Sequence, residues 1–117
     1  MPDLKLRNLN KSDTSFVFKM LKLLRGQAQY NERSLHRYLD KNRFFSNGQN
    51  LILIAHEDKN NVGLITCNKY ALPRYLGFGY DIEEVVVHPR YQKLGKGKKM
   101  IDLFINWCKK DKMIRKI

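Results

Sequence analysis

The stretch YDIEEVVVHPRYQKLGKGKKMIDLFINWC, residues 80–108, decides the fold. It begins with the β-branched run Ile82–Val87, which is typical of a strand, and ends in apolar residues at helical spacing. Two glycines, Gly95 and Gly97, stand between these elements. The first N–H groups of a helix lack partners within it, and the helix dipole adds partial positive charge there. We therefore predict an anion site where this helix begins.

The residues around this turn favour phosphate as the anion. Lys or Arg occurs five times between His88 and Lys99, and Asp or Glu does not occur there. Glycines let phosphate oxygens approach successive backbone amides closely. The Walker loop is excluded because Gly97-Lys98 is followed by a lysine and not by Ser or Thr. A dinucleotide fingerprint would need a third glycine and a place after the first strand of the chain, so the pattern argues against it.

The turn Gln92–Gly97 resembles the acyl-CoA signature Gln/Arg-x-x-Gly-x-Gly/Ala of the GNAT superfamily of N-acyltransferases. The preceding segment, Ile82–Gln92, is similar to the fourth strand of that family and to its V-x-P-x-Y/F approach to the loop. The resemblance extends over the whole chain and is strongest after Gly79. It implies an α/β (α+β) fold with a mixed, mainly antiparallel central sheet flanked by helices, in the order β-α-α-β-β-β-α and then a possible further strand.

Patterns before residue 80 agree with that order. Residues 4–9 alternate as an outer strand, and residues 51–55 form an apolar run typical of a strand covered on both faces. Residues 62–70 resume as a strand after a polar turn, which predicts a hairpin. Two amphipathic helices are expected between them, the first capped by Ser12 and the second beginning at Asn31 and burying Leu35, Tyr38 and Leu39.

Length and composition indicate one domain, residues 1–117. No apolar run approaches the roughly 18 residues that span a bilayer, and no signal region is visible, so we expect a cytoplasmic protein without a membrane partner. Cys67 and Cys108 are expected in the core, and the histidines lack ligand-like neighbours, so we predict no metal site.

The family resemblance also sets expectations for the end of the chain. Residues 113–117 read as the first residues of a fifth strand, after which family members continue with a helix that carries a tyrosine general acid. We therefore expect part of the family fold to be missing, whether the chain is a fragment or a natural truncation. An unpaired strand edge at residues 80–87 would then be available to a second copy, so a homodimer is expected as one possible assembly.

The resemblance assigns acetyl-CoA as co-substrate and places it on one strand and the following turn. The expected cofactor-binding residues are Val85, Val86, Val87, Gln92, Lys93, Leu94, Gly95, Lys96, Gly97 and Lys98. The candidate catalytic bases are Asp81, Glu83 and Glu84. In a regular strand Asp81 and Glu83 share a face and Glu84 points away, which favours the first two. A bulge, common in this strand of the family, would exchange the roles of Glu83 and Glu84.

The predicted activity is N-acetyl transfer from acetyl-CoA to a primary amine on a small molecule, a peptide or a protein. One alternative is a catalytically inactive module that keeps the coenzyme A cradle. Another is a basic interaction domain, because the formal net charge is +12 and the second helix carries Arg33, Arg37, Lys41 and Arg43 on one side. No helix-turn-helix or single-strand-binding motif is present, which argues against nucleic acid as the main partner.

Overall fold

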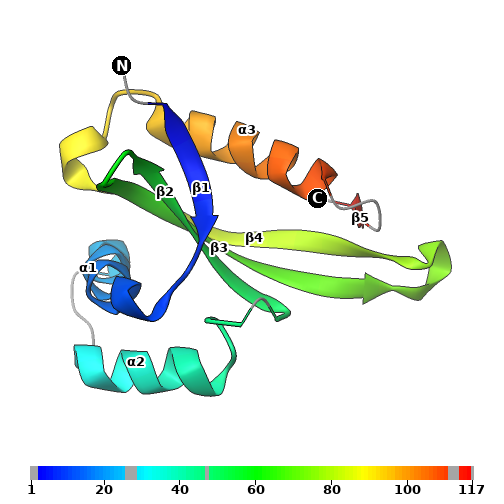
Figure 1. Cartoon of the computed structure of the whole chain (residues 1–117), viewed down its shortest axis with the longest axis horizontal. Coiled ribbons are helices and arrows are strands. Elements are labelled where there is room, and N and C mark those ends of the chain that lie inside the picture. Colours follow the sequence, from blue (N-terminus) through cyan, green and yellow to red (C-terminus); the bar gives the residue numbers. More distant parts are fainter. Residues whose placement is uncertain (1–2, 26–28, 47, 111–113, 117) are drawn as a thin grey trace.

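The computed structural model describes residues 3–25, 29–46, 48–110 and 114–116. The strands and helices follow one another in the predicted order (Figure 1). They are β1 (Leu4–Asn8), α1 (Thr14–Arg25), α2 (Glu32–Lys41), β2 (Asn50–Glu57), β3 (Asn60–Leu72), β4 (Gly77–Val87), α3 (Lys96–Lys109) and β5 (Ile114–Lys116). Three short 3₁₀ helices lie between them: η1 (Lys11–Asp13), η2 (Pro73–Tyr75) and η3 (Pro89–Tyr91).

The strands form one five-stranded sheet in the order β1-β2-β3-β4-β5. The first four strands are antiparallel, and β5 runs parallel to β4. Helices α1 and α2 cover one face and α3 covers the other (Figure 1). The predicted mixed, mainly antiparallel sheet flanked by helices is therefore confirmed, as are the outer position of β1 and the β2–β3 hairpin.

A hydrophobic core lies on each face of the sheet, and β2 contributes to both because its side chains alternate between the two faces. Ile52 and Ile54 pack with α1 and α2, whereas Leu51, Leu53 and Ala55 pack with α3. All five are buried, as a strand covered on both faces requires. Cys67 of β3 and Cys108 of α3 are both buried in the core between the sheet and α3, which confirms their predicted place.

The helical segment that leads into α1 begins differently from the prediction, because Asn10 and not Ser12 is the capping residue. The Asn10 side chain accepts a hydrogen bond from the Ser12 backbone N–H at 3.0 Å, and Asp13 accepts one from the Asn10 N–H at 2.9 Å. This capping box begins η1, from which α1 continues. Asp13 also accepts two hydrogen bonds from the Arg7 guanidinium, at 2.7 and 2.8 Å, and so ties β1 to the helix.

Replacing Asp13→Asn should lower the free energy of unfolding at pH 7 by about 2 kcal/mol, since Asp13 is only 4% exposed and Arg7 would lose its counter-ion. Burial favours a higher pKa for Asp13, but hydrogen bonds from Arg7 and the Asn10 amide, with the Arg7 charge, hold that pKa below its ordinary value. The stabilisation is thus present above roughly pH 4 and is lost as the pH falls through the folded-state pKa. Urea unfolding at pH 7 and at pH 3.5 measures this; an equal gap between variant and wild type at both values would contradict it.

None of the helices in the described segments is long and apolar enough to cross a membrane. The far end of the β3–β4 hairpin extends beyond the other strands of the sheet (Figure 1). Strand β5 contacts β4 near this end, at Phe78 and Gly79. In the described part of the chain, the β4 edge from residue 80 to residue 87 has no strand beside it, as the sequence predicted.

Candidate active site

The turn between β4 and α3 leaves backbone amides free at the start of a helix. Gly95 is the N-cap of α3 and adopts the left-handed conformation, with φ 73°. Lys93 is also left-handed, with φ 65°. The first hydrogen bond of the helix runs from the Lys99 N–H to the Gly95 carbonyl at 3.3 Å, and no side chain caps this end. Among the described residues, the N–H groups of residues 96–98 are therefore available to an anion.

The turn is held against the end of β4 by side chains on either side of it. The Gln92 amide donates a hydrogen bond to the Val87 carbonyl at 3.0 Å. His88 Nδ1 accepts one from the Arg90 N–H at 3.1 Å. Burial, followed by the charges of Lys19 and Arg90, lowers the pKa of His88, which keeps that nitrogen able to accept. His88 thus caps η3.

The backbone of β4 offers two residues to its open edge. The His88 N–H donates to the Val62 carbonyl at 2.7 Å, and Val86 stands opposite Leu64 in the same register. Hydrogen-bonded positions alternate along an antiparallel pair, so the backbone groups of Val85 and Val87 point away from β3. Val86 is paired to β3 and its side chain is buried in the α1/α2 core. Of the three valines predicted to bind the cofactor, only Val85 and Val87 present backbone groups at the edge.

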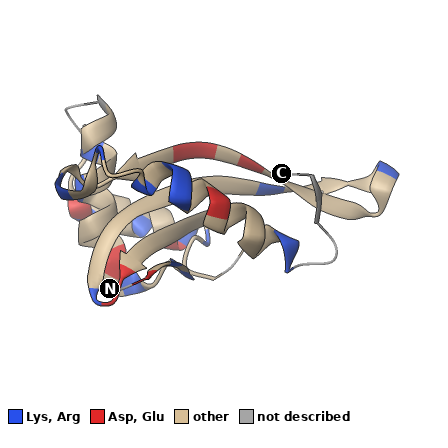
Figure 2. Ribbon diagram, turned by 90° about the horizontal axis from the view of Figure 1, so that it is seen from above, with Lys and Arg blue, Asp and Glu red and all other residues tan. Residues whose placement is uncertain are grey.

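The lysines of the turn do not all contribute charge to it. Lys96 forms an ion pair with Glu57 at the end of β2, and both side chains are largely buried. Lys93 and Lys98 are exposed, so their charges remain beside the free amides. Figure 2 shows Lys and Arg spread over the helices and loops, whereas β4 carries acidic segments. Leu94 is 61% exposed and Gly95 has no atom within 4 Å of an added β-carbon, so the turn is open to solvent.

A bulge in β4 changes the direction of its acidic side chains. Thr66 stands opposite Glu84 and Cys67 opposite Ile82, which leaves Glu83 as an extra residue. The Glu83 and Glu84 side chains consequently line the same pocket, contrary to the expectation for a regular strand. The bulge that the family resemblance implied is present. Asp81 stands opposite Asn68, is exposed, and does not line the pocket.

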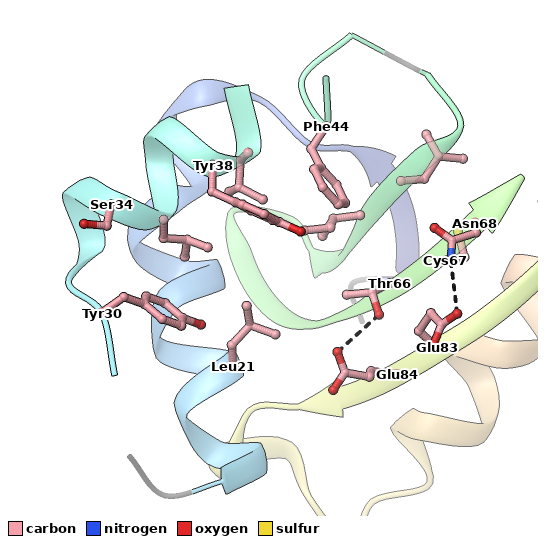
Figure 3. Close-up of a pocket in the computed structure, with 14 residues that line it drawn as sticks. Leu21, Tyr30, Ser34, Tyr38, Phe44, Thr66, Cys67, Asn68, Glu83 and Glu84 are labelled. Carbon is pink, nitrogen blue, oxygen red and sulfur yellow. Dashed lines mark hydrogen bonds between the residues drawn. The ribbon is translucent and has the colours of Figure 1, made fainter. Parts of the chain in front are cut away.

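Each glutamate has a hydrogen-bond partner on β3 (Figure 3). The Asn68 amide donates to Glu83 Oε1 at 3.0 Å, and the Thr66 hydroxyl makes a long contact of 3.5 Å with Glu84 Oε1. Glu84 is half-buried, whereas Glu83 is exposed. The Glu84 carboxylate is therefore partly shielded from water, and its hydrogen bond from the Thr66 hydroxyl is long and weak. Val85, whose backbone faces the open edge, follows it directly in the chain.

The pocket has a volume of about 590 Å³ and lies between the sheet and the two N-terminal helices. Its walls are mainly apolar and aromatic, and no Lys, Arg or His is among the described residues that line it. The lining residues are Leu21, Tyr30, Ser34, Leu35, Tyr38, Leu39, Phe44, Leu51, Ile52, Thr66, Cys67, Asn68, Glu83 and Glu84. Sequence reasoning placed Tyr38 in the core, but it is 58% exposed at the pocket wall. The feature of the sequence that could have indicated this exposure is the Tyr38 hydroxyl, a polar group in a stripe of α2 that is otherwise apolar.

Cys67 lines the same pocket, but it is not a candidate nucleophile. Burial, assisted by the neighbouring Cys108, raises the pKa of Cys67 to about 12. The thiol is therefore protonated at neutral pH and does not provide a thiolate. Within the described segments, no group of three or more His, Cys, Asp or Glu residues is arranged to hold a metal ion.

Comparison with known proteins agrees with this geometry. A family model described as Acetyltransferase (GNAT) family matches residues 17–117. None of the curated proteins compared with the chain matches it.

Solved structures share the fold. A possible acetyltransferase from Clostridium difficile 630 superimposes with a TM-score of 0.80 at 16% identity, over 97% of this chain and 76% of that one. A GNAT family acetyltransferase from Staphylococcus aureus gives 0.74 at 22% identity, over 100% and 87%. Glucosamine-6-phosphate N-acetyltransferase from Arabidopsis thaliana gives 0.70 at 21% identity, over 98% and 82%.

Proposed function

Because the chain belongs to the GNAT acetyltransferase family, we propose that it transfers the acetyl group of acetyl-CoA to a primary amine. One observation carries the proposal. A short connection joins the end of β4 to the start of α3, and the Gln92–Val87 hydrogen bond holds it in place. Its β4 end presents the outward-facing backbone groups of Val85 and Val87, and its α3 end presents free amides. This arrangement suits a ligand with an anionic end and an extended amide-containing arm.

The residues present fit coenzyme A. The amides of residues 96–98 would bind the diphosphate, with the charges of Lys93 and Lys98 beside it. The Val85 carbonyl and the Val87 N–H would bind the pantetheine arm as an added strand would, since Gln92 already occupies the Val87 carbonyl. When bound, acetyl-CoA supplies the activated acetyl group and the thiol leaving group. The Val85 N–H would then be left to stabilise negative charge on the thioester oxygen.

Glu84 is the base that the geometry favours. An amine must lose its proton before it can attack a thioester, so a carboxylate is needed next to the reacting atoms. Glu84 lines the pocket, is half-buried and directly precedes Val85. Glu83 lines the pocket but is exposed and engaged by Asn68. Asp81 lies outside the pocket lining.

The Lys96–Glu57 ion pair holds the first turn of α3 against the end of β2. In this arrangement Lys96 contributes its backbone N–H to the anion site and leaves Glu57 neutralised. Glu57 is therefore a positioning residue. The fixed helix start matters because the free amides must converge on one anion for the site to bind it tightly.

Replacing Gly97→Asp should weaken acetyl-CoA binding at least tenfold without loss of stability. Side chains on a helix lean toward its N-terminus, so the new carboxylate would lie near the amides that phosphate oxygens approach and would repel the diphosphate. Its β-carbon would meet only Val87 Cγ2, at an ordinary 3.7 Å, and a carboxylate in the first turn of a helix is favourable. Calorimetric titration and thermal unfolding measure the two effects. Gly97→Ala, which the family signature also permits, and Gly48→Ala, remote in sequence and with contacts no closer than 3.7 Å, are the controls and should keep the wild-type affinity; unchanged affinity in Gly97→Asp would contradict the assignment of the site.

Titration with acetyl-CoA followed by thiol release with a panel of amines tests the proposed function. Binding and thiol release together support an N-acetyltransferase. Binding without thiol release from any amine would instead identify an inactive coenzyme A module. Failure of both, with salt-dependent binding to oligonucleotides, would favour the basic interaction domain.

The open β4 edge also bears on the oligomeric state. A strand from a second copy would need the same backbone groups of Val85 and Val87 that the proposed pantetheine site uses. Acetyl-CoA and a homodimer through this edge would therefore exclude each other. Analytical ultracentrifugation with and without acetyl-CoA tests this: dimers that persist unchanged with saturating ligand would contradict a shared edge.

A further inference from the structure

We propose that the acceptor is a monoamine carried on an apolar or aromatic body, with no phosphate or other anionic group. This inference deepens the proposed function and rests on it, because it assigns the acceptor to the pocket beside Glu84. It depends on the chemistry of the pocket wall, which neither the family match nor the structural neighbours specify.

The charge of the pocket is opposite to that of the protein. The chain has 23 Lys and Arg residues and a net charge of +12, yet none of the described residues that line this pocket is cationic. Glu83 and Glu84 are the only charged residues in that described lining. A cationic amine would be attracted to these carboxylates, whereas a phosphate group would find no counter-ion among these residues and would be repelled by the carboxylates. The Arabidopsis neighbour acts, by its name, on glucosamine 6-phosphate; the pocket described here does not suit such an acceptor.

The two carboxylates lie on one side of the pocket, and a mainly apolar and aromatic wall, which also carries the hydroxyls of Tyr30, Ser34 and Tyr38, forms the other (Figure 3). Glu83 and Glu84 come from β4, while Tyr38 and Phe44 lie across the pocket from them (Figure 3). Leu21 of α1 closes a further side. An amine at Glu84 would thus place its carbon body among Leu21, Tyr38 and Phe44, where burial of apolar surface is favourable.

The far side of the pocket also disfavours polar acceptors. The hydroxyls of Tyr30, Ser34 and Tyr38 offer a polyhydroxylated body some hydrogen bonds, but against Leu21 and Phe44 it would lose its hydrogen bonds to water without replacement. A diamine long enough to cross the pocket would place its second charge next to the same apolar side chains, away from both carboxylates. We therefore expect the pocket to prefer an acceptor that carries a single amino group.

Thiol release from acetyl-CoA with ethylamine, butylamine, hexylamine and 2-phenylethylamine tests the proposal. We expect kcat/KM to rise about fourfold for each added methylene until the pocket is filled. Hexylamine should exceed both 1,6-diaminohexane and glucosamine 6-phosphate by at least tenfold. Preference for the diamine or the sugar phosphate would overturn the inference while leaving N-acetyl transfer intact.

A variant pair locates the effect in the pocket. Tyr38→Arg places a cation in the wall at a residue that is 58% exposed, so folding should be retained. We expect it to lower kcat/KM for hexylamine at least tenfold with acetyl-CoA affinity unchanged. Tyr75→Arg, at a 53% exposed tyrosine in η2 and outside the pocket, should change neither value. Equal effects of the two variants would overturn the assignment.

Direct binding separates this inference from the proposed function. Calorimetric titration with hexylamine, without acetyl-CoA, should show binding that Tyr38→Arg weakens and Tyr75→Arg does not. If no amine releases thiol, the proposed function fails, and this binding measurement alone decides whether the pocket takes apolar amines. Absence of hexylamine binding together with turnover of polar amines would overturn the inference.

Discussion

Glu84→Gln should reduce kcat/KM for the amine by 100-fold or more while acetyl-CoA still binds with unchanged affinity. The carboxylate is half-buried, lines the pocket and precedes the outward-facing Val85 backbone, so it is the acid best placed to take the proton of the amine. Glutamine keeps the shape and can retain the long contact with Thr66, but it cannot act as a base. Loss of a general base typically lowers the rate by a factor of about 10² to 10⁴.

Two matched substitutions make this result specific. Glu83→Gln leaves the Asn68 contact available and should change kcat/KM about fivefold or less, since an exposed charge contributes weakly. Asp81→Asn, outside the pocket lining, should be neutral. Thiol-release kinetics on the three variants, with calorimetry for acetyl-CoA, provide the comparison. A larger loss in Glu83→Gln than in Glu84→Gln would transfer the base role to Glu83.

Gly63→Ala should destabilise the fold by about 3 kcal/mol, the largest stability effect that we expect from a single methyl group. A β-carbon at Gly63 would lie 2.3 Å from the Val86 carbonyl oxygen and 3.1 Å from Met100 Cε. The first contact is with the backbone of β4, which cannot rotate away as a side chain can. Relief requires β3 and β4 to separate beside Val85 and Val87, so acetyl-CoA affinity should fall as well.

Urea unfolding measures the stability of Gly63→Ala, and Gly48→Ala is again the control. At Gly48 a β-carbon would meet Arg43 atoms at 3.7 Å, an ordinary contact, so the free energy of unfolding should change by less than about 1 kcal/mol. Equal unfolding midpoints for the two variants would show that β3 and β4 are less closely packed at Gly63 than the structure indicates.

The strand, turn and helix from residue 77 to residue 109 were predictable because their signals are local. The β-branched run, Pro89, the two glycines and the helical stripe each constrain a few neighbouring residues, and together they agree on one arrangement. The buried strand β2 was predictable for the same reason, from its uninterrupted apolar run. The capping residue of the first helix was not, because Asn10 and Ser12 are both favourable caps and only the Arg7–Asp13 contact distinguishes them.

The candidate site depends on contacts between distant parts of the chain, which explains where the sequence was insufficient. The directions of Glu83 and Glu84 follow from the register of β4 against β3, where the bulge adds one residue. The charge of Lys96 is neutralised by Glu57, which precedes it by 39 residues. The exposure of Tyr38 reflects the space between α2 and the sheet, which no periodicity along α2 encodes.

Backbone amide chemical shifts during titration with acetyl-CoA test the central claim most directly. In ¹⁵N-labelled protein, the amides of residues 96–98 and those of Val85 and Val87 should shift together and saturate with one dissociation constant. Gly97→Asp should weaken binding by at least tenfold, and amides on the solvent side of α2 should not respond. Unchanged amides at residues 96–98 with millimolar acetyl-CoA would contradict the proposed cofactor site and, with it, the proposed N-acetyl transfer.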